Sequence, residues 1–445
     1  MRHREQRCKM HFIMKLKRKP ALQPNHILLI GFLVIILIGS LLLMLPIAQN
    51  QKGSLSYIDA LFISTSAVCV TGLVTVDVAL TFSLFGRTVI ALLILLGGLG
   101  FASIVISFGL LLGMNIGIGK RTLIKEAYNL STMQGTLRVV RAVAIAGFVF
   151  QALGTFIEYF IFRNAYAPSA AFGHALFNTI SAFNNAGFDL MGEYKSLTDY
   201  RFNLGMNLTT AFLIILGGSG FFVLSDVFKN RRWSKMSMHT RIVLTMNLIL
   251  LAGGTLFFAV EERLDLLSSF FQSATARTAG FNTVDIGSFS QAGLLVMMAL
   301  MFIGASPGST GGGIKTTTTF TLFLSLGSLM FRREPAVFKR KIGNESILKA
   351  FQVLLLSAFL VSGGCFVILL AEGERFSFIS VLFETVSAFA TVGLSTGITT
   401  TLGSISKVVI MITMFAGRVG PITIATSLKA KPSHLSYVEE QVFIG

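Results

Sequence analysis

Four short segments of this chain share one pattern, and this repeat constrains the fold more than any other feature of the sequence. In each segment a glycine follows a small residue by six positions and a phenylalanine by ten, and a leucine or phenylalanine comes next. The four glycines are Gly72, Gly187, Gly280 and Gly393. Glycine adopts backbone angles that a Cβ forbids, so each segment is expected to end in a hairpin. Four such hairpins indicate four equivalent elements around one axis.

The composition places these hairpins in a membrane protein. The 445 residues are 53% hydrophobic and 13% charged, whereas soluble domains carry about 25% charged residues. A membrane-spanning helix needs about 20 apolar residues, and such runs are expected at 27–47, 85–114, 142–162, 204–228, 242–261, 294–330, 348–371 and 408–428. Between the members of each pair lies a shorter apolar stretch that ends at a repeat glycine, which is the length of a re-entrant half-helix.

The predicted fold class is therefore an all-α polytopic membrane protein. Four units, each with a span, a pore helix with its hairpin and a second span (M1–P–M2), surround one pore in a pseudo-fourfold arrangement. The predicted units cover 22–118, 119–232, 233–335 and 336–430, with tails at 1–21 and 431–445. Each unit crosses the membrane an even number of times, so all four have the same orientation. The inverted repeats of many secondary transporters do not fit this parity.

The positive charges predict the orientation. The net charge is +17, and 26 of the 37 Lys and Arg residues lie in the tails and in the connections between units. Cytoplasmic loops of membrane proteins carry such an excess, so both termini are expected in the cytoplasm and the tail of 1–21 is a basic cytoplasmic segment. The charges do not form a nucleic-acid-binding face, and three scattered cysteines are too few for a disulfide framework.

The hairpins are candidate ligands for a dehydrated cation. Backbone carbonyls replace the hydration shell of the ion in potassium-selective filters, and the short helices direct their negative ends toward such a site. The predicted filter residues, which would hold potassium through their carbonyls, are Val70, Thr71, Gly72, Asn185, Ala186, Gly187, Thr278, Ala279, Gly280, Thr391, Val392 and Gly393. The segment 391–393 also matches the first three letters of the potassium filter motif TVGYG. The alternative is that the glycines only allow close helix packing.

A second candidate element is the glycine-rich segment 304–315 within the sixth apolar run. Six of its residues are Gly or Pro, which disfavour a continuous helix, so a mobile loop below the filter is expected. Arg418 lies in the last apolar run, where a charge is costly and usually functional. The alternatives are a harmless kink and an arginine that reaches the inner surface. The predicted gate residues are Gly304, Ser306, Pro307, Gly308, Ser309, Thr310, Gly311, Gly312, Gly313, Lys315 and Arg418.

With these motifs, the chain resembles the membrane subunit of Trk/Ktr/HKT-type potassium transporters, most closely the bacterial Ktr branch. The resemblance extends from about Pro24 to Leu428 and includes the four filter glycines and the interrupted helix. It implies a single chain that mimics a tetrameric potassium channel, with an intramembrane gating loop. Glycine in all four filters goes with potassium preference in that family, whereas serine at the first position goes with sodium-permeable plant relatives.

The resemblance also implies the surroundings of the chain. These are a bacterial plasma (inner) membrane, a homodimer within the lipid bilayer, and a cytosolic ring of nucleotide-binding RCK (KtrA-like) subunits. Na⁺ is a candidate activator or co-ion beside the transported K⁺, and no organic cofactor is expected in this chain. An enzyme is not expected, because HExxH, paired intramembrane carboxylates and a nucleophile–histidine dyad are absent from the sequence. The other alternative is a secondary transporter for a larger solute, which the even number of membrane crossings in each unit disfavours.

Overall fold

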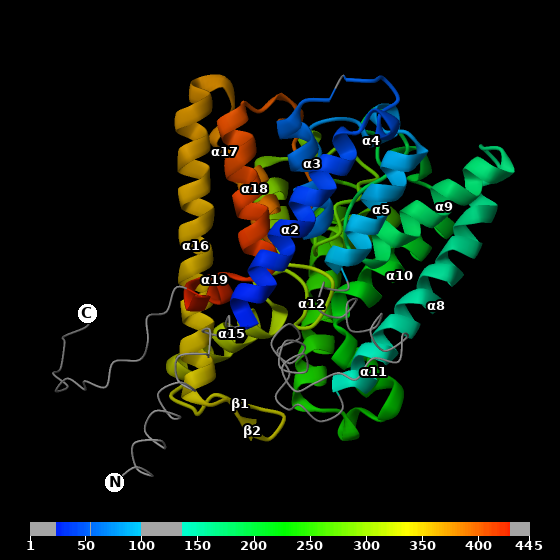
Figure 1. The fold of residues 1–445 in the computed structure, drawn as a ribbon. Helices are drawn as coiled ribbons and strands as arrows, with labels where there is room; N and C mark the ends of the chain where they lie inside the picture. The colour runs from blue at the N-terminus through cyan, green and yellow to red at the C-terminus, as the bar shows by residue number, and fades with distance from the viewer. Residues whose placement is uncertain (1–23, 54, 99–135, 428–445) are drawn as a thin grey trace, which may run out of the picture.

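The computed structural model describes residues 24–53, 55–98 and 136–427, and Figure 1 shows a bundle of helices packed around a shared interior. The predicted tails, 1–21 and 431–445, lie outside the described residues. So does the second half of the predicted run at 85–114.

Within the described part of the chain, four helices are long and apolar enough to cross a membrane on their own. They are α2 (Pro24–Met44), α8 (Thr136–Phe162), α12 (Met238–Glu261) and α16 (Asn344–Glu372). Their 21 to 29 residues correspond to roughly 30–45 Å at about 1.5 Å per residue. Each begins one of the four predicted units.

Four shorter helices follow the long ones and end directly before the hairpins. They are α3 (Tyr57–Cys69), α9 (Pro168–Phe183), α13 (Leu266–Thr275) and α17 (Phe378–Ala390). With 10 to 16 residues they are too short to cross a bilayer. Their starts are encoded locally, because the side chains of Ser56, Asp265 and Ser377 each accept a hydrogen bond from a first-turn N–H group. In α9, Pro168 occupies the first turn instead.

The third helix of each unit is shorter than the sequence led us to expect. These helices are α5 (Leu84–Gly98), α10 (Leu204–Ser219), α14 (Gln291–Phe302) and α18 (Ser404–Val419). The expectation of continuous helices over 204–228 and 408–428 is wrong. The chain bends by 96° between α10 and α11 (Phe221–Lys229), and α18 gives way to α19 (Pro421–Ser427). Gly220 and Gly420 have φ of +88° and +92°, which an α-helix does not accommodate. After α14, the helical path resumes only at α15 (Thr316–Met330).

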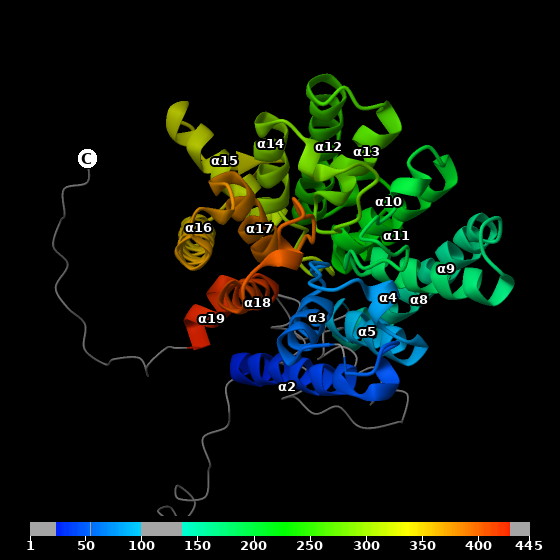
Figure 2. The same ribbon diagram turned by 90° about the horizontal axis from the view of Figure 1, so that it is seen from above.

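The contacts between helices are cyclic. Within each unit the first helix packs on the short helix and on the third helix. Between units, α5 packs on α9, α10 on α13, α14 on α17, and α18 on α3, which joins the fourth unit back to the first. At that joint Lys407 donates to Asp59 at 2.7 Å. Figure 2 shows the units in order around a central region.

The remaining described elements are short. They are the helix α4 (Val78–Thr81), the 3₁₀ turns at Pro46–Ala48, Thr198–Tyr200, Trp233–Lys235, Ile286–Ser288, Gly373–Arg375 and Thr399–Thr401, and an antiparallel pair β1 (Ala336–Val337) and β2 (Arg340–Lys341). The apolar interior includes three of the four repeated phenylalanines, Phe62, Phe177 and Phe383. The fourth, Phe270, is only partly buried, and its neighbour Phe271 takes the buried position.

Candidate functional site

All four hairpins have the same unusual backbone at two positions. The residue two before the glycine has a positive φ, which is +51° at Val70, +56° at Asn185, +85° at Thr278 and +52° at Thr391. The glycine also has a positive φ, between +68° and +94°. A β-branched residue with positive φ is a genuine outlier. Such strained residues persist only where the surroundings hold them, and they cluster at functional sites.

Hydroxyl groups at the small position of the repeat hold three of the hairpins. Ser66 Oγ accepts from Gly72 N at 3.1 Å, and Ser387 Oγ accepts from Gly393 N at 3.1 Å. Ser181 Oγ accepts from Phe188 N at 2.8 Å. The third hairpin has Ala274 at this position and therefore has no such bond. The repeat pattern predicted only that these residues are small, although the recurrence of serine at three of the four positions was a visible signal of this role.

The four glycines form a closed ring. A β-carbon added to any of them would fall within 2.6 Å of a carbonyl oxygen on the next hairpin. The pairs are Gly72 with Ala186, Gly187 with Ala279, Gly280 with Val392, and Gly393 with Thr71. Because the last pair returns to the first hairpin, the structure brings together all four predicted filter segments. Only glycine fits where backbones approach this closely.

Further glycines hold the third helices against the ends of the short helices. A β-carbon on Gly97, Gly217 or Gly417 would collide with a backbone carbonyl in the last turn of the short helix of the same unit, at Val68, Phe183 and Phe389 respectively. Each carbonyl belongs to the residue four before the hairpin glycine. The third unit differs, because a β-carbon on Gly304 would instead meet the carbonyl of Gly312.

The segment 303–315 folds into a compact loop in this third unit. Ala305 N donates to Gly312 O at 3.3 Å, and Ile303 bridges Ile314, so the two arms of the loop are joined at its neck. Thr316 Oγ1 donates to Ser306 Oγ at 3.1 Å. The predicted gate residues therefore lie together, and Ser306, Thr310, Gly311 and Gly312 among them are buried.

This loop lies against the hairpins. Thr310 Oγ1 donates to Asn185 Oδ1 at 3.1 Å, and Gly312 N donates to Thr391 Oγ1 at 3.0 Å. Asn185 Nδ2 in turn donates to Thr278 Oγ1 at 3.1 Å. The polar side chains that precede three of the ring glycines thus form one hydrogen-bonded network with the loop. The first hairpin has Val70 there and offers no polar side chain.

Two cationic side chains complete the site. Arg418 donates from Nη1 to the carbonyl of Thr310 and from Nη2 to the carbonyls of Gly97 and, at 3.2 Å, Gly98. It therefore links the fourth unit, the loop and the end of α5. Lys315 Nζ donates to Gly311 O at 2.7 Å. Backbone carbonyls thus accept hydrogen bonds from both cations.

Glu384 is a buried carboxylate that sequence reasoning missed. It lies in α17 and is 1% exposed. Its oxygens accept from Ser395 Oγ at 2.6 Å, from Thr396 N at 2.9 Å and from Thr399 Oγ1 at 2.6 Å. Glu384 therefore holds the segment that follows the fourth hairpin. A single charged residue within a re-entrant apolar stretch was the signal that could have identified it.

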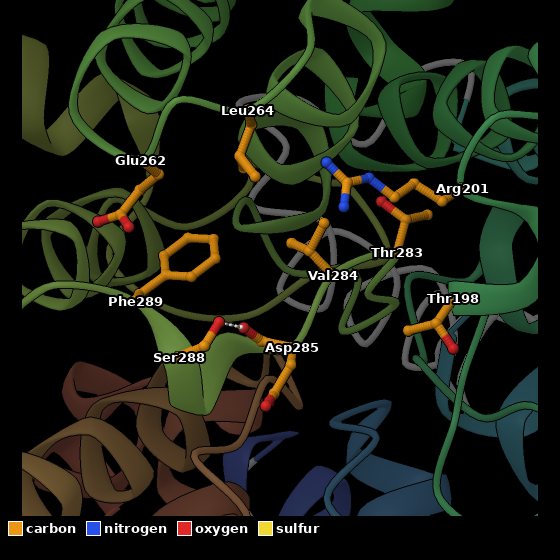
Figure 3. Close-up of a pocket in the computed structure, with 9 residues that line it drawn as sticks. All are labelled: Thr198, Arg201, Glu262, Leu264, Thr283, Val284, Asp285, Ser288 and Phe289. Atoms are coloured by element: carbon orange, nitrogen blue, oxygen red, sulfur yellow. Dashed lines mark hydrogen bonds between the residues drawn. The ribbon is translucent and has the colours of Figure 1, made fainter.

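A surface cavity of about 540 Å³ lies near the end of α12 and beside the segment that follows the third hairpin. Figure 3 shows Arg201 and Glu262 on opposite sides of it. Arg201 pairs with Asp265 at 3.0 Å, and Glu262 accepts from Ser290 Oγ at 2.7 Å. The charged groups of the cavity are thus already used in connecting loops, and none of the predicted site residues lines it. Among the described residues no cluster of three or more metal-ligating His, Cys, Asp or Glu side chains occurs.

Comparisons with known proteins agree with this architecture. The model of the TrkH family, described as cation transport protein, matches residues 20–437. The Ktr system potassium uptake protein B of Bacillus subtilis is 39% identical over 95% of this chain and 97% of its own length. The potassium/sodium uptake protein NtpJ of Enterococcus hirae is 35% identical over 97% of this chain and 100% of its own.

A solved structure shows the same fold. The crystal structure of the potassium transporter TrkH from Vibrio parahaemolyticus superimposes with a TM-score of 0.69 over 93% of this chain and 86% of that one, at 19% sequence identity. The resemblance inferred from the motifs is thus confirmed, and a family of transporters rather than enzymes accounts for nearly the whole chain. This chain belongs to the TrkH family of cation transport proteins.

Proposed function

We propose that this protein is the membrane-spanning, ion-translocating subunit of a potassium uptake system. The observation that carries the proposal is the closed ring of four hairpins, in which each glycine packs on a carbonyl of the next hairpin. The names of the relatives in Bacillus subtilis and Enterococcus hirae, which are potassium and potassium/sodium uptake proteins, support the choice of ion.

Conduction through the ring is channel-like. Backbone oxygens of the twelve predicted filter residues replace the water around K⁺, and no charged side chain is required. The C-terminal ends of α3, α9, α13 and α17 precede the hairpins and add a favourable potential for a cation. The cyclic packing of the four units supports a pseudo-fourfold pore along the membrane normal.

The segment 304–315 acts as the gate in this proposal. It contacts Asn185 and Thr391 from one side of the ring, and Arg418 and Lys315 add positive charge there. A loop and two cations at this place oppose the passage of K⁺, so the loop moves when the pathway opens. The hydrogen bond that Arg418 donates to Thr310 O of the loop defines the closed position.

The orientation and partners follow from charge and family. The starts of α2, α8 and α16 and the β1–β2 pair lie at one end of the molecule (Figure 1). The basic connections 229–241 and 331–349 adjoin the starts of α12 and α16, so this end faces the cytoplasm. The protein works as a homodimer in the bacterial cell membrane and is controlled by a cytosolic ring of RCK-type nucleotide-binding subunits. Na⁺ serves as activator or co-ion.

Rescue of growth tests this function. The chain is expressed in cells that lack potassium uptake, alone and together with a cytosolic RCK-type subunit. We expect growth at limiting K⁺ and uptake of Rb⁺ that excess K⁺ inhibits, with a higher rate when the cytosolic subunit is present. Expression in the membrane without Rb⁺ uptake under either condition would contradict the proposal.

A further inference from the structure

The segment 221–235, which consists of α11 and the turn that follows it, forms a surface that the proposed conduction mechanism does not use. The chain enters it through the 96° bend after α10. Gly220 makes the bend possible, since its φ is +88°. If α10 crosses the bilayer, α11 runs close to the plane of the membrane.

The depth of this segment follows from its contacts with the next helix. Asp226 accepts from Ser237 N at 2.9 Å and from Thr240 Oγ1 at 2.5 Å, at the start of α12. Because α12 has 24 residues and spans the bilayer, its first turn lies at the membrane boundary. Asp226 holds α11 at the same level, and the orientation proposed above makes this the cytoplasmic boundary.

Three aromatic side chains of the segment are exposed, although Phe222 also contacts His239 and Trp233 contacts Phe338 edge to face. Phe222 is 45% exposed, Phe228 66% and Trp233 47%. Aromatic rings that are exposed at the boundary between water and lipid are typical of membrane-interface segments. Trp233 is the only tryptophan of the chain.

The same segment carries a dense group of cations. Lys229, Arg231, Arg232 and Lys235 are all exposed, and across the described ranges none of them pairs with a carboxylate. The nearby carboxylate of Asp226 is occupied by Asn230 and by the start of α12. Four cations beside exposed aromatic rings complement the phosphate groups of a membrane surface.

We propose that the segment 221–235 lies in the cytoplasmic interface of the membrane and binds the headgroups of anionic phospholipids. A soluble protein partner would also satisfy the cations, but it would leave Phe222 and Phe228 without a matching apolar phase. Lipid satisfies both, because its acyl chains cover the rings while its phosphates meet the guanidinium groups. The inference rests on the orientation in the proposed function.

Three backbone hydrogen bonds connect the gate loop to the chain around the bend, two at the end of α10 and one at the first residue of the lipid segment. Ser306 N donates to Gly218 O at 3.0 Å, and Thr310 N donates to Gly217 O at 3.2 Å. Phe221 N, the first group of α11, donates to Gly308 O at 3.1 Å. The loop thus binds the carbonyls that the bend leaves free at the end of α10. A lipid that holds α11 at the interface therefore also biases the position of the loop.

The single tryptophan allows a direct test. The full chain is reconstituted in vesicles that contain a brominated phosphatidylglycerol or a brominated phosphatidylcholine at the same mole fraction, and Trp233 fluorescence is recorded. We expect about twofold or stronger quenching by the anionic lipid, decreasing with salt. The variant Arg231→Gln/Arg232→Gln should lose this difference, whereas the matched pair Arg332→Gln/Arg333→Gln, also exposed, should retain it.

Three results would overturn the proposal. Equal quenching by both lipids removes the headgroup preference. If neither lipid quenches Trp233, the segment does not lie in the membrane interface. If an added cytosolic RCK-type subunit then shifts the Trp233 emission, a protein binds this surface instead. If anionic lipid still changes K⁺ flux after residues 308–313 are deleted, the lipid site does not act through the loop. Absence of K⁺ flux with selective quenching intact would instead contradict the proposed conduction and leave lipid binding supported.

Discussion

The ring of hairpins and the loop below it are built on opposite principles. In the ring, all four units repeat one backbone conformation, and every glycine makes the same contact with its neighbour. In the layer below, the units differ. The third helix bends at Gly220 in the second unit and at Gly420 in the fourth, and it opens into the segment 303–315 in the third.

This difference separates two tasks. A cation on an axis is surrounded evenly only if each unit supplies the same oxygens, so the ring tolerates little variation. A single obstruction is enough to close a pathway, so one unit can carry it. Arg418, like the loop, occurs in one unit, where it donates to the loop. The corresponding position of the second unit is Gly218.

The largest expected effect comes from breaking the ring. The substitution Gly393→Ala adds a methyl group that collides with Thr71 O and Gly72 Cα at a φ of +92°. The left-handed backbone costs about 1–2 kcal/mol and overpacking a further ~1–3 kcal/mol. We expect Rb⁺ uptake to fall by about 100-fold or more. The control is Gly363→Ala in α16, where no atom lies within 4 Å of the new methyl group. Normal uptake by the Gly393 variant would contradict the close ring.

The next effect comes from removing the obstruction. Arg418→Gln removes the guanidinium that donates to Thr310 O of the loop and to Gly97 O of α5. Deletion of 308–313 removes the loop residues themselves. We expect the initial rate of Rb⁺ uptake per protein molecule to rise several-fold in both variants. Arg333→Gln removes an exposed arginine and serves as the control. Unchanged rates in both variants would show that the loop does not gate.

A smaller effect should follow from loosening one hairpin. Ser387→Ala removes the acceptor of Gly393 N, and the loss of a half-buried hydrogen bond of this kind costs about 0.5 kcal/mol. We expect the ratio of K⁺ to Na⁺ uptake to fall by about twofold. The fold should survive, because the third unit already has Ala274 at this position. Ser357→Ala in α16, whose hydroxyl bonds only within its own helix, should not change the ratio. Unaltered selectivity in the Ser387 variant would show that this hydroxyl does not contribute to ion selection.

The smallest expected effect concerns the joint between the fourth and first units. Burial raises the pKa of Asp59, but hydrogen bonds from Lys407 and Ser56 outweigh it and hold the pKa below its usual value. The depressed pKa stabilises the folded state above the ordinary carboxyl range, and this contribution is lost as the pH falls through the folded-state pKa.

Accordingly, Asp59→Asn should cost about 1 kcal/mol or less at neutral pH. The thermal unfolding curves of the variant and the unaltered protein in detergent should converge below about pH 4. Lys195→Met, which removes the exposed pair with Glu193, should leave the curve unchanged. A difference that grows in acid would contradict the assigned sign.

Features that depend on residues close together in the chain could be predicted from the sequence. The helical membrane architecture and the hairpin glycines follow from apolar runs and fixed spacings. The family was inferred from the resemblance that these motifs carry, and the comparisons confirm it. The interruption near 304 could be expected, since six Gly and Pro residues in one stretch disfavour any helix.

Features that depend on distant partners could not be predicted. The bend at Gly220 accompanies the docking of Ser306 and Thr310, which lie about ninety residues away in the chain. A lone Gly in an apolar run is equally consistent with a straight helix. The role of Ser66 depends on which backbone N–H faces its hydroxyl. The two tails and the segment 99–135 lie outside the described residues, so the expectations for them stay predictions.

The most direct test of the central claim is the position of the ion. Crystals or vitrified particles of the protein would be prepared in Tl⁺ or Rb⁺, and the ion located by anomalous scattering or by difference density against a Na⁺ preparation. The account predicts density on the axis, equally distant from the hairpins that end at Gly72, Gly187, Gly280 and Gly393. Hairpins that stand apart, or bound ions that lie only elsewhere, would contradict it.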